Sequence, residues 1–195
     1  MNPSRPLEAV ASAALLVATT PAALAAAAAI RLTDGGPVLF RQTRLGMNRD
    51  PFTLLKFRSM RDGRVTPAGR LLRELGWDEL PQLVNVLRGE LAFIGPRPLT
   101  PDDVARLEAD HPALGGRFTV RPGLTGLIQV LGTRGAAFSV AVENAYAAHA
   151  REAPAHAGLD AQILLLTAGA ALLGKDRLRR LVGRFPAWKK RLLFL

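Results

Sequence analysis

Residues 73–98, RELGWDELPQLVNVLRGELAFIGPRP, are the stretch that decides the fold and first indicates the chemistry. Apolar residues at positions 80, 83, 84 and 87 follow the spacing of one helical face. Pro81 suits the first turn of that helix and Gly89 suits its end. We therefore expect Asp78 and Glu79 at the N-terminal end of a short buried helix, where unpaired N–H groups and the helix dipole favour negative charge.

Arg97 and Arg121 lie in segments where neighbouring prolines restrict the backbone. Prolines on both sides of Arg97 exclude a helix there, because each proline fixes its own φ and restricts the residue before it. Arg121 precedes Pro122-Gly123, a pair that predicts a type II turn with Pro at its second position and Gly at its third. Both guanidinium groups are thus expected on rigid loops.

Other local signals place the remaining elements. Residues 38–43 and 52–57 read as a small β-hairpin around a polar turn. Thr66-Pro67 predicts the start of a helix that ends at Gly76, and Thr100-Pro101 predicts another start. The uncharged run 163–173 is too short to span a bilayer, so a core or interfacial helix is expected.

These residues suit the cleavage of a nucleotide diphosphate. That reaction needs a nucleophile, positive charge on the phosphates and often Mg²⁺ held by one or two carboxylates. Asp78 and Glu79 supply carboxylates, and the basic residues able to neutralise phosphate oxygens are Lys56, Arg58, Arg73, Arg97 and Arg121. On the pattern alone, solvated acids at a helix start and arginines in surface salt bridges remain the alternative. The chain has no cysteine, which excludes disulfides and thiolate metal sites.

Residues 9–30 form an uncharged segment long enough to cross a bilayer as a straight helix. Twelve of these 22 residues are alanine, and Pro21 lies near the middle, where it removes an internal hydrogen bond. Thr19 and Thr20 can satisfy backbone carbonyls locally. We expect a re-entrant helix broken at Thr20-Pro21; a single span and a cleavable signal peptide are the alternatives.

The net charge of +10 is concentrated at the end of the chain. Residues 175–195 hold eight Lys or Arg against one Asp, interleaved with Leu178, Phe185 and Trp188. Such a segment predicts an amphipathic helix at a membrane interface, and a solvated helix packed on its own domain is the alternative.

Several motifs resemble those of the bacterial sugar transferases, the monotopic phosphoglycosyl transferases. The hallmark run Asp-Glu-Leu-Pro-Gln-Leu at 78–83 is followed by Gly-Pro-Arg-Pro at 95–98. Other stretches similar to the family's signatures occur in the same order, namely GPVLFRQTRLG at 36–46, KFRSM at 56–60 and RPGLTG at 121–126. Several ordered motifs are far more specific than one.

The resemblance implies an enzyme that transfers a sugar phosphate from a nucleoside-diphosphate sugar, expected to be a UDP-sugar, to polyprenyl phosphate. It implies that Asp78 is the nucleophile of a covalent phosphosugar intermediate and that Glu79 assists it or helps to hold Mg²⁺. It also implies that Lys56, Arg73, Arg97 and Arg121 contact substrate phosphates. The expected location is the bacterial inner membrane, with the catalytic domain on the cytoplasmic face. Membrane lipids are expected partners and nucleic acid is not.

Three features depart from the family's motifs. Glu90 stands where aspartate is usual, residues 127–132 differ from the usual ending, and the acidic residue expected near a tyrosine pair is unclear around residues 143–146. The last two bear on sugar recognition and on activity.

The sequence thus predicts a helix-dominated α+β protein with a small β-hairpin. Its expected parts are a re-entrant helix at 1–31, a catalytic domain at 32–158 and C-terminal helices at 159–195. The competing functions are an inactive family member and a membrane-anchored basic module that binds anionic lipid or nucleic acid. The sequence indicates neither the sugar nor the oligomeric state.

Overall fold

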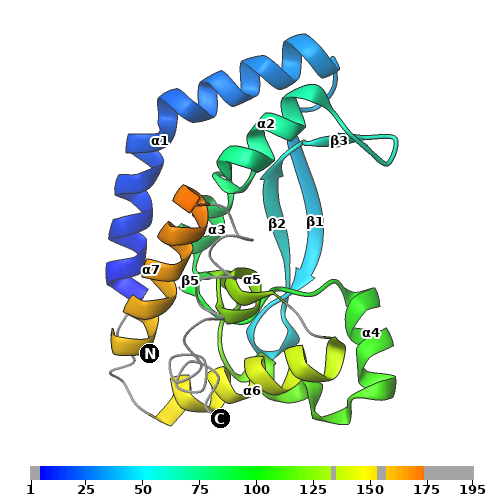
Figure 1. Ribbon diagram of the computed structural model, residues 1–195, viewed down its shortest axis with the longest axis vertical. Coiled ribbons are helices and arrows are strands. Elements are labelled where there is room, and N and C mark those ends of the chain that lie inside the picture. Colours follow the sequence, from blue (N-terminus) through cyan, green and yellow to red (C-terminus); the bar gives the residue numbers. More distant parts are fainter. Residues whose placement is uncertain (1–4, 133–134, 153–156, 174–195) are drawn as a thin grey trace. The chain divides into compact units, whose positions relative to one another are not determined.

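Helices dominate the computed structural model, which describes residues 5–132, 135–152 and 157–173 (Figure 1). The α-helices are α1 (Arg5–Asp34), α2 (Pro67–Leu75), α3 (Gln82–Arg88), α4 (Pro101–Asp110), α5 (Leu127–Leu131), α6 (Ala136–Glu152) and α7 (Ala157–Leu173). The 3-10 helices are η1 (Met47–Arg49), η2 (Trp77–Glu79) and η3 (Pro112–Thr119). The strands are β1 (Leu39–Leu45), β2 (Pro51–Phe57), β3 (Met60–Arg61), β4 (Arg64–Val65), β5 (Ala92–Ile94) and β6 (Gly123–Thr125). The predicted helix-dominated class with small sheets is confirmed.

The chain folds as two compact units. The first comprises Met1–Thr43 and Phe52–Leu91, and the second comprises Arg44–Pro51 and Ala92–Leu195. Strands β1 and β2 form the predicted two-stranded sheet, and both continue from one unit into the other. The three parts expected from the sequence, with boundaries after residues 31 and 158, stay a prediction.

Helix α1 runs without a break through Thr20-Pro21, where the sequence predicted one. Pro21 lies inside one continuous helix, which Figure 1 shows bent midway along its length. The Thr19 and Thr20 hydroxyls donate to the carbonyls of Leu15 and Leu16, at 2.7 and 2.8 Å. Both are local bonds to the carbonyl four residues earlier, a type that often bends a helix, but neither reaches the carbonyl of Val17, which Pro21 leaves without its N–H partner. The helix also runs past residue 31, to Asp34.

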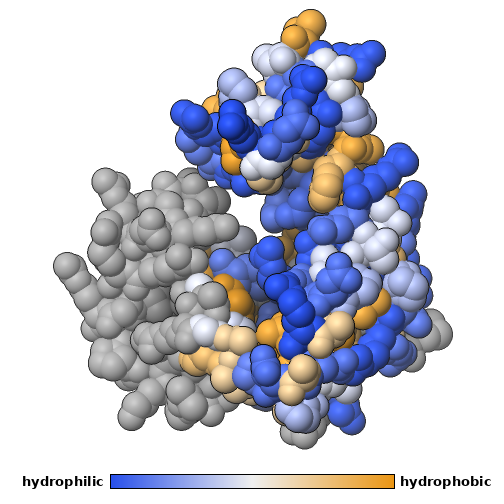
Figure 2. Space-filling model, turned by 90° about the vertical axis from the view of Figure 1, so that its right-hand side faces the viewer, coloured by the Kyte–Doolittle hydropathy of each residue, from blue (hydrophilic) through white to orange (hydrophobic). Residues whose placement is uncertain are grey.

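Helix α1 exposes a large amount of apolar surface. Leu7, Val10, Val17, Leu24 and Leu32 are each at least 66% exposed. By length and composition, α1 alone among the described helices could cross a membrane. By contrast, the coloured residues on the face drawn in Figure 2 are mainly hydrophilic, with hydrophobic side chains between them. Scattered apolar side chains are normal on a surface, whereas several on one helix indicate a lipid or protein contact.

The first unit packs α2 and α3 against α1. Ala26 and Ile30 of α1 form a core with Phe57 and Leu72, which Trp77 and Leu80 partly cover. Nearer the start of the helix, the buried Ser12 hydroxyl donates to the carbonyl of Leu83 in α3, at 2.6 Å. Helix α1 is therefore fastened to the helix that follows the Asp78-Glu79 pair.

The helix boundaries of both units follow the predicted signals. The Thr66 hydroxyl accepts from the N–H of Gly69, and α2 ends at Gly76 with a left-handed φ of 70°. Helix α3 ends at Gly89, with φ 80°. Thr100 and Asp103 form a reciprocal capping box at the start of α4. These predictions are confirmed. They could be made from the sequence because each depends on contacts within one turn.

The second unit contains a parallel strand pair that the sequence did not predict. Ala92 pairs with Gly123 and Ile94 with Thr125. The expected type II turn is wrong, since Gly123 lacks the positive φ that this turn requires and instead begins β6. A Cβ at Gly123 would lie 2.0 Å from the backbone nitrogen of Gly95. Glycine is therefore needed there for the close approach of two backbones.

The core of the second unit lies among its helices. One cluster joins α5, α6 and α7 through buried side chains that include Val130, Tyr146 and Ile163, and another joins α4, η3 and α6. The predicted helix over 163–173 is confirmed as part of α7, which buries Ile163 and Leu166. The predicted interfacial segment at 175–195, with Leu178, Phe185 and Trp188, lies outside the described residues.

Candidate active site

Asp78 and Glu79 lie in the 3-10 turn η2, between α2 and α3. The sequence predicted them at the start of α3 itself, but that helix begins later, at Gln82, after Pro81. Trp77 and Leu80, on either side of the pair, pack against the core of the first unit. Both acids are therefore held on a short turn that is anchored at each end, and both remain partly exposed.

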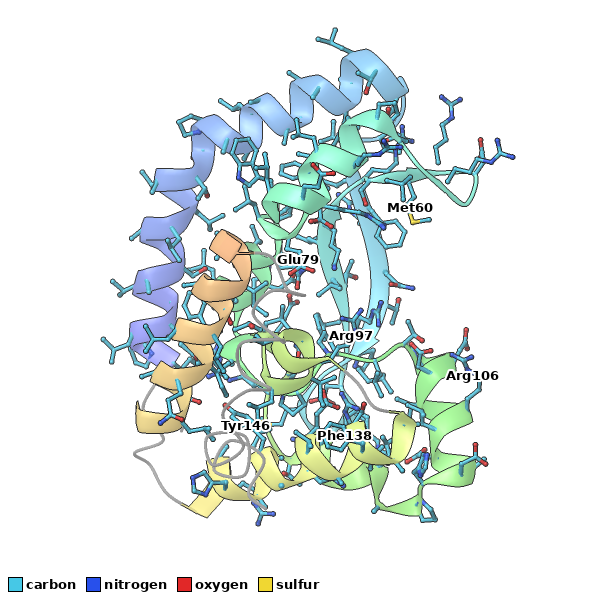
Figure 3. All side chains as sticks on the ribbon, in the orientation of Figure 1. Met60, Glu79, Arg97, Arg106, Phe138 and Tyr146 are labelled. Atoms are coloured by element: carbon cyan, nitrogen blue, oxygen red, sulfur yellow. The ribbon has the colours of Figure 1, made fainter. Side chains whose placement is uncertain are left out.

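Lys56 reaches the acidic pair from β2. Its Nζ lies 2.9 Å from Oε1 of Glu79, the side chain labelled in Figure 3. Phe52, Leu54 and Phe57 of the same strand are buried, which fixes the strand against the core and directs Lys56 to the turn. The structure thus brings together Lys56 and Glu79, two of the residues predicted from the sequence.

Burial raises the pKa of the Asp78 carboxyl above its ordinary value, and the neighbouring negative charge of Glu79 raises it further. The positive charges of Lys56 and Arg73 oppose this rise but do not cancel it. Arg73 lies in the last turn of α2, as predicted, and its Nε donates to the Ser59 hydroxyl at 2.9 Å. A partly desolvated carboxylate with a raised pKa is typical of a reactive site. The cations beside it can also bind phosphate oxygens.

Asn85 links the two elements that carry this site, a role that the sequence did not predict. Its fully buried side chain accepts from the N–H of Leu55 and donates to the carbonyl of Thr53, at 3.1 and 2.7 Å. It also donates to the carboxylate of Glu90 at 2.6 Å. Glu90, one of the departures from the family's motifs, thus has a bonding partner. Asn85 therefore joins β2, which carries Lys56, to α3, which follows the acidic pair.

We expect Asn85→Ala to lower the free energy of unfolding by about 2–4 kcal/mol, because the N–H of Leu55 and the carbonyl of Thr53 would lose their partner and a buried cavity would be left. Thermal or chemical unfolding of the purified protein in detergent measures this loss. Glu74→Ala, at an exposed position of α2, is the control and should change stability by no more than about 0.5 kcal/mol. A loss in Asn85→Ala no larger than in the control would contradict the role assigned to Asn85.

Arg58 is held at the end of α1. Its Nη2 and the Nη1 of Arg61 both donate to the carbonyl of Asp34, at 3.2 and 3.0 Å. A Cβ at Gly36 would overlap the Arg58 guanidinium. Cations at a helix C-terminus are stabilising, so this geometry supports a structural role for Arg58. Its predicted contact with substrate phosphate stays a prediction.

Arg97 and Arg121 belong to the second unit, and their closeness to Asp78 stays a prediction. Arg97, labelled in Figure 3, lies in the extended loop after β5, as predicted, and its side chain is exposed. Arg121 lies just before β6, where the carbonyl of Pro122 accepts from the N–H of Ala92 at 2.8 Å. Glu143 accepts from the backbone N–H of Arg97. The sequence indicated no such contact, since 46 residues separate the two.

The acidic pair has the composition of a Mg²⁺ site that is completed by substrate. Among the described residues, no three His, Asp or Glu side chains form a metal-binding group. Mg²⁺ in phosphate-handling proteins is commonly held by one or two carboxylates together with phosphate oxygens and water. Asp78 and Glu79 fit that requirement, and further protein ligands are not needed for it.

These features define a class of protein before any comparison is made. Paired carboxylates beside a lysine and an arginine suit phosphate chemistry, and the unit that holds them also has a helix long and apolar enough to enter a membrane. The chain belongs to the bacterial sugar transferase family, whose family model matches residues 3–174. The resemblance seen in the sequence motifs is thereby confirmed.

Similar proteins have names that agree with this family. The chain is 46% identical over 145 residues to a UDP-glucose:undecaprenyl-phosphate glucose-1-phosphate transferase of Caulobacter vibrioides. It is 40% identical over 138 residues to a protein of the same name in Escherichia coli, and 33% identical over 167 residues to the exopolysaccharide production protein ExoY of Rhizobium meliloti. The aligned residues cover 67%, 62% and 71% of this chain. They span 54%, 29% and 73% of the respective relatives, so the chain matches only part of each.

Proposed function

We propose that this protein transfers a sugar phosphate from a UDP-sugar to polyprenyl phosphate, giving a polyprenyl-diphospho-sugar and UMP. The observation that carries the proposal is the turn η2, which holds Asp78 and Glu79 beside Lys56 and Arg73. Family membership and the printed names of the relatives support the same reaction.

The proposed chemistry has two steps at one phosphorus atom. A carboxylate oxygen of Asp78 attacks the phosphorus that bears the sugar, and the bond from this phosphorus to the bridging oxygen breaks. UMP leaves with that oxygen, and an acyl phosphate links Asp78 to the sugar. An oxygen of polyprenyl phosphate then attacks the same phosphorus, the bond to Asp78 breaks, and the free carboxylate is restored.

Positive side chains serve this chemistry by neutralising phosphate oxygens. Lys56 and Arg73 are the cations beside the acidic pair. We assign Arg97 and Arg121 to the same substrate phosphates, since arginine suits two-point contacts with phosphate. The residues that would hold Mg²⁺ are Asp78 and Glu79; the ion would supply charge that stabilises the leaving phosphate.

A UMP-release assay tests the proposal. Purified protein in detergent or nanodiscs is given a panel of UDP-sugars, undecaprenyl phosphate and Mg²⁺, and UMP and the lipid-linked sugar are measured. We expect both products with at least one sugar. Without the lipid acceptor, UMP release should stop at one equivalent per protein and no lipid-linked sugar should form. No turnover with any sugar would favour the inactive member, and binding of anionic vesicles without turnover would favour the basic module.

Arg97→Lys should lower kcat/KM by at least about tenfold, equivalent to about 1.4 kcal/mol of transition-state stabilisation. Lysine keeps the charge but loses the fork of N–H donors. The same assay measures the change. Arg106→Lys in α4, an exposed arginine labelled in Figure 3, is the matched control. Near-normal kcat/KM in Arg97→Lys would show that Arg97 makes no two-point contact with substrate phosphate.

For the membrane, we propose that α1 enters and leaves one leaflet, so that the protein is monotopic on the cytoplasmic face of the inner membrane. The bend in α1, its high alanine content and its exposed apolar side chains support this arrangement. The arrangement places the catalytic unit where a soluble UDP-sugar and a lipid-embedded acceptor meet.

Single cysteines test this topology, since the chain has none of its own. Pro3→Cys and Glu74→Cys should both resist an impermeant maleimide in intact spheroplasts and react after lysis. Replacing Pro21 with leucine should make part of the Pro3→Cys population reactive from outside, because a straight helix favours a full span. Labelling of Pro3→Cys from outside in the chain with Pro21 would show a span instead.

A further inference from the structure

One buried ion pair holds the backbone of Arg97 from both sides. Nη1 of Arg117 in η3 lies 2.7 Å from Oε2 of Glu143 in α6, and the two side chains are only 4% and 6% exposed. The other carboxylate oxygen of Glu143 accepts from the N–H of Arg97 at 2.8 Å. The Nη2 of Arg117 donates to the backbone carbonyl of Arg97. The pair therefore binds both polar backbone groups of one residue.

A third contact fixes the next residue of the loop. Nη1 of Arg44, at the end of β1, donates to the carbonyl of Pro98 at 2.9 Å. The adjacent backbone N–H of Leu45 donates to the carbonyl of Leu99, also at 2.9 Å. Prolines 96 and 98 have no N–H, so the amide of Arg97 is the only donor that this part of the loop can offer.

Stability alone is a poor explanation for this arrangement. Removing two charges from water costs several kcal/mol for each ion, and replacing such a pair with apolar side chains is often neutral or stabilising. Burial here works against both charges, since it raises the pKa of Glu143 and lowers that of Arg117. Because the pair also bonds both backbone groups of one loop residue, it is better explained by the conformation that it imposes on that residue.

The side chain of Arg97 is left available by these contacts. It is exposed, and within the described part of the chain no carboxylate forms an ion pair with its guanidinium. The nearby positive charges of Arg44 and Arg117 are close enough to be affected by it. A fixed backbone, an exposed guanidinium and neighbouring cations together suit the recognition of an anionic group.

We propose that Arg117 and Glu143 are positioning residues, which fix the backbone of Arg97 so that its guanidinium is presented to a substrate phosphate. The phosphate contact rests on the proposed function, whereas the fixation of the loop does not. The acidic residue that was unclear from the sequence around residues 143–146 thereby acquires a role, and its partner Arg117 is a residue that the sequence did not single out.

Hydrogen exchange tests the fixation without any substrate. Arg97 carries the only backbone amide hydrogen in residues 96–98, so overlapping peptides in mass spectrometry report it alone. We expect its exchange to be at least about tenfold faster in Glu143→Ala, because the buried acceptor is lost. Glu143→Gln keeps an acceptor oxygen and should restore much of the protection. Glu108→Ala, which removes the exposed partner of Arg49 in the same unit, should leave it unchanged.

A double-mutant cycle tests the link to Arg97. Glu143→Ala and Arg97→Ala should each raise KM for the UDP-sugar or lower kcat by about tenfold, and the double variant should be no worse than Arg97→Ala. A purely structural role for Glu143 would give its full loss again in the Arg97→Ala background. Protected amides in α4 and α6 show that each variant is folded, and Glu143→Gln replaces Glu143→Ala in the cycle if the latter is not.

The outcomes separate the two proposals. Faster exchange at Arg97 with non-additive losses supports the positioning role. Unchanged exchange, or fully additive losses, overturns it. If the wild-type protein turns over no UDP-sugar, the proposed function fails, and the exchange at Arg97 still decides whether the pair fixes the loop.

Discussion

Asp78→Asn is expected to reduce turnover by at least about 1,000-fold and to abolish the covalent intermediate. An amide is nearly the same size as a carboxylate, but it cannot attack phosphorus and leave again as a carboxylate. The fold should survive. The pKa of Asp78 is higher in the folded protein than in the unfolded chain. The free energy of unfolding therefore falls as pH rises from the unfolded-state pKa through the folded-state pKa, since ionisation is less favourable in the folded state. At neutral pH the asparagine variant should therefore be at least as stable as the wild type.

Mass spectrometry of the intermediate gives the decisive measurement. Wild-type protein with UDP-sugar and Mg²⁺, but without lipid acceptor, should gain the mass of a sugar phosphate on the peptide that contains Asp78. Asp78→Asn should gain none, and the exposed control Asp110→Asn in α4 should behave as the wild type. An active Asp78→Asn protein, or an adduct on another residue, would show that the nucleophile lies elsewhere.

The parts of this fold that the sequence predicted are those governed by neighbouring residues. The caps at Thr66 and Thr100 and the helix ends at Gly76 and Gly89 need contacts only within a turn or two. The predicted start of α3 was about one turn too early, so that it included Asp78 and Glu79, because the apolar spacing starts at Leu80 and does not reveal a separate 3-10 turn. The ion pair between Lys56 and Glu79 was not predicted, since no local pattern joins positions 23 residues apart.

Contacts between distant segments account for what was missed. The parallel pairing of β5 with β6 involves strands of three residues, which are too short to show a period. The same limit explains the wrong turn at Gly123, where glycine serves the approach of a second backbone. Arg117 and Glu143 are buried charges that only the tertiary structure brings together. Likewise, Arg58 carries a charge that suits phosphate, and the structure uses it at the end of α1.

Glu79→Gln is expected to lower kcat by about 100-fold at neutral pH, through loss of a Mg²⁺ ligand or of assistance to Asp78. If the carboxylate holds the metal, chelation should bring the wild-type rate close to that of the variant. The variant itself should then lose little more on chelation. A variant that keeps both its full rate and its full sensitivity to chelator would remove Glu79 from the site.

The pH dependence of the remaining activity tests how the acidic pair works. Asp78 must be ionised to attack, so kcat/KM should fall as pH drops through its pKa, which burial and the charge of Glu79 raise. Glu79→Gln removes the like charge and should move this acid limb to lower pH. Lys56→Met removes a cation that lowers the same pKa and should move the limb to higher pH. Profiles of kcat/KM against pH for the three proteins, with circular dichroism to confirm folding, measure both shifts. Opposite shifts identify the limb with Asp78, because a carboxylate elsewhere, or one on the substrate, would not respond to both changes with opposite signs.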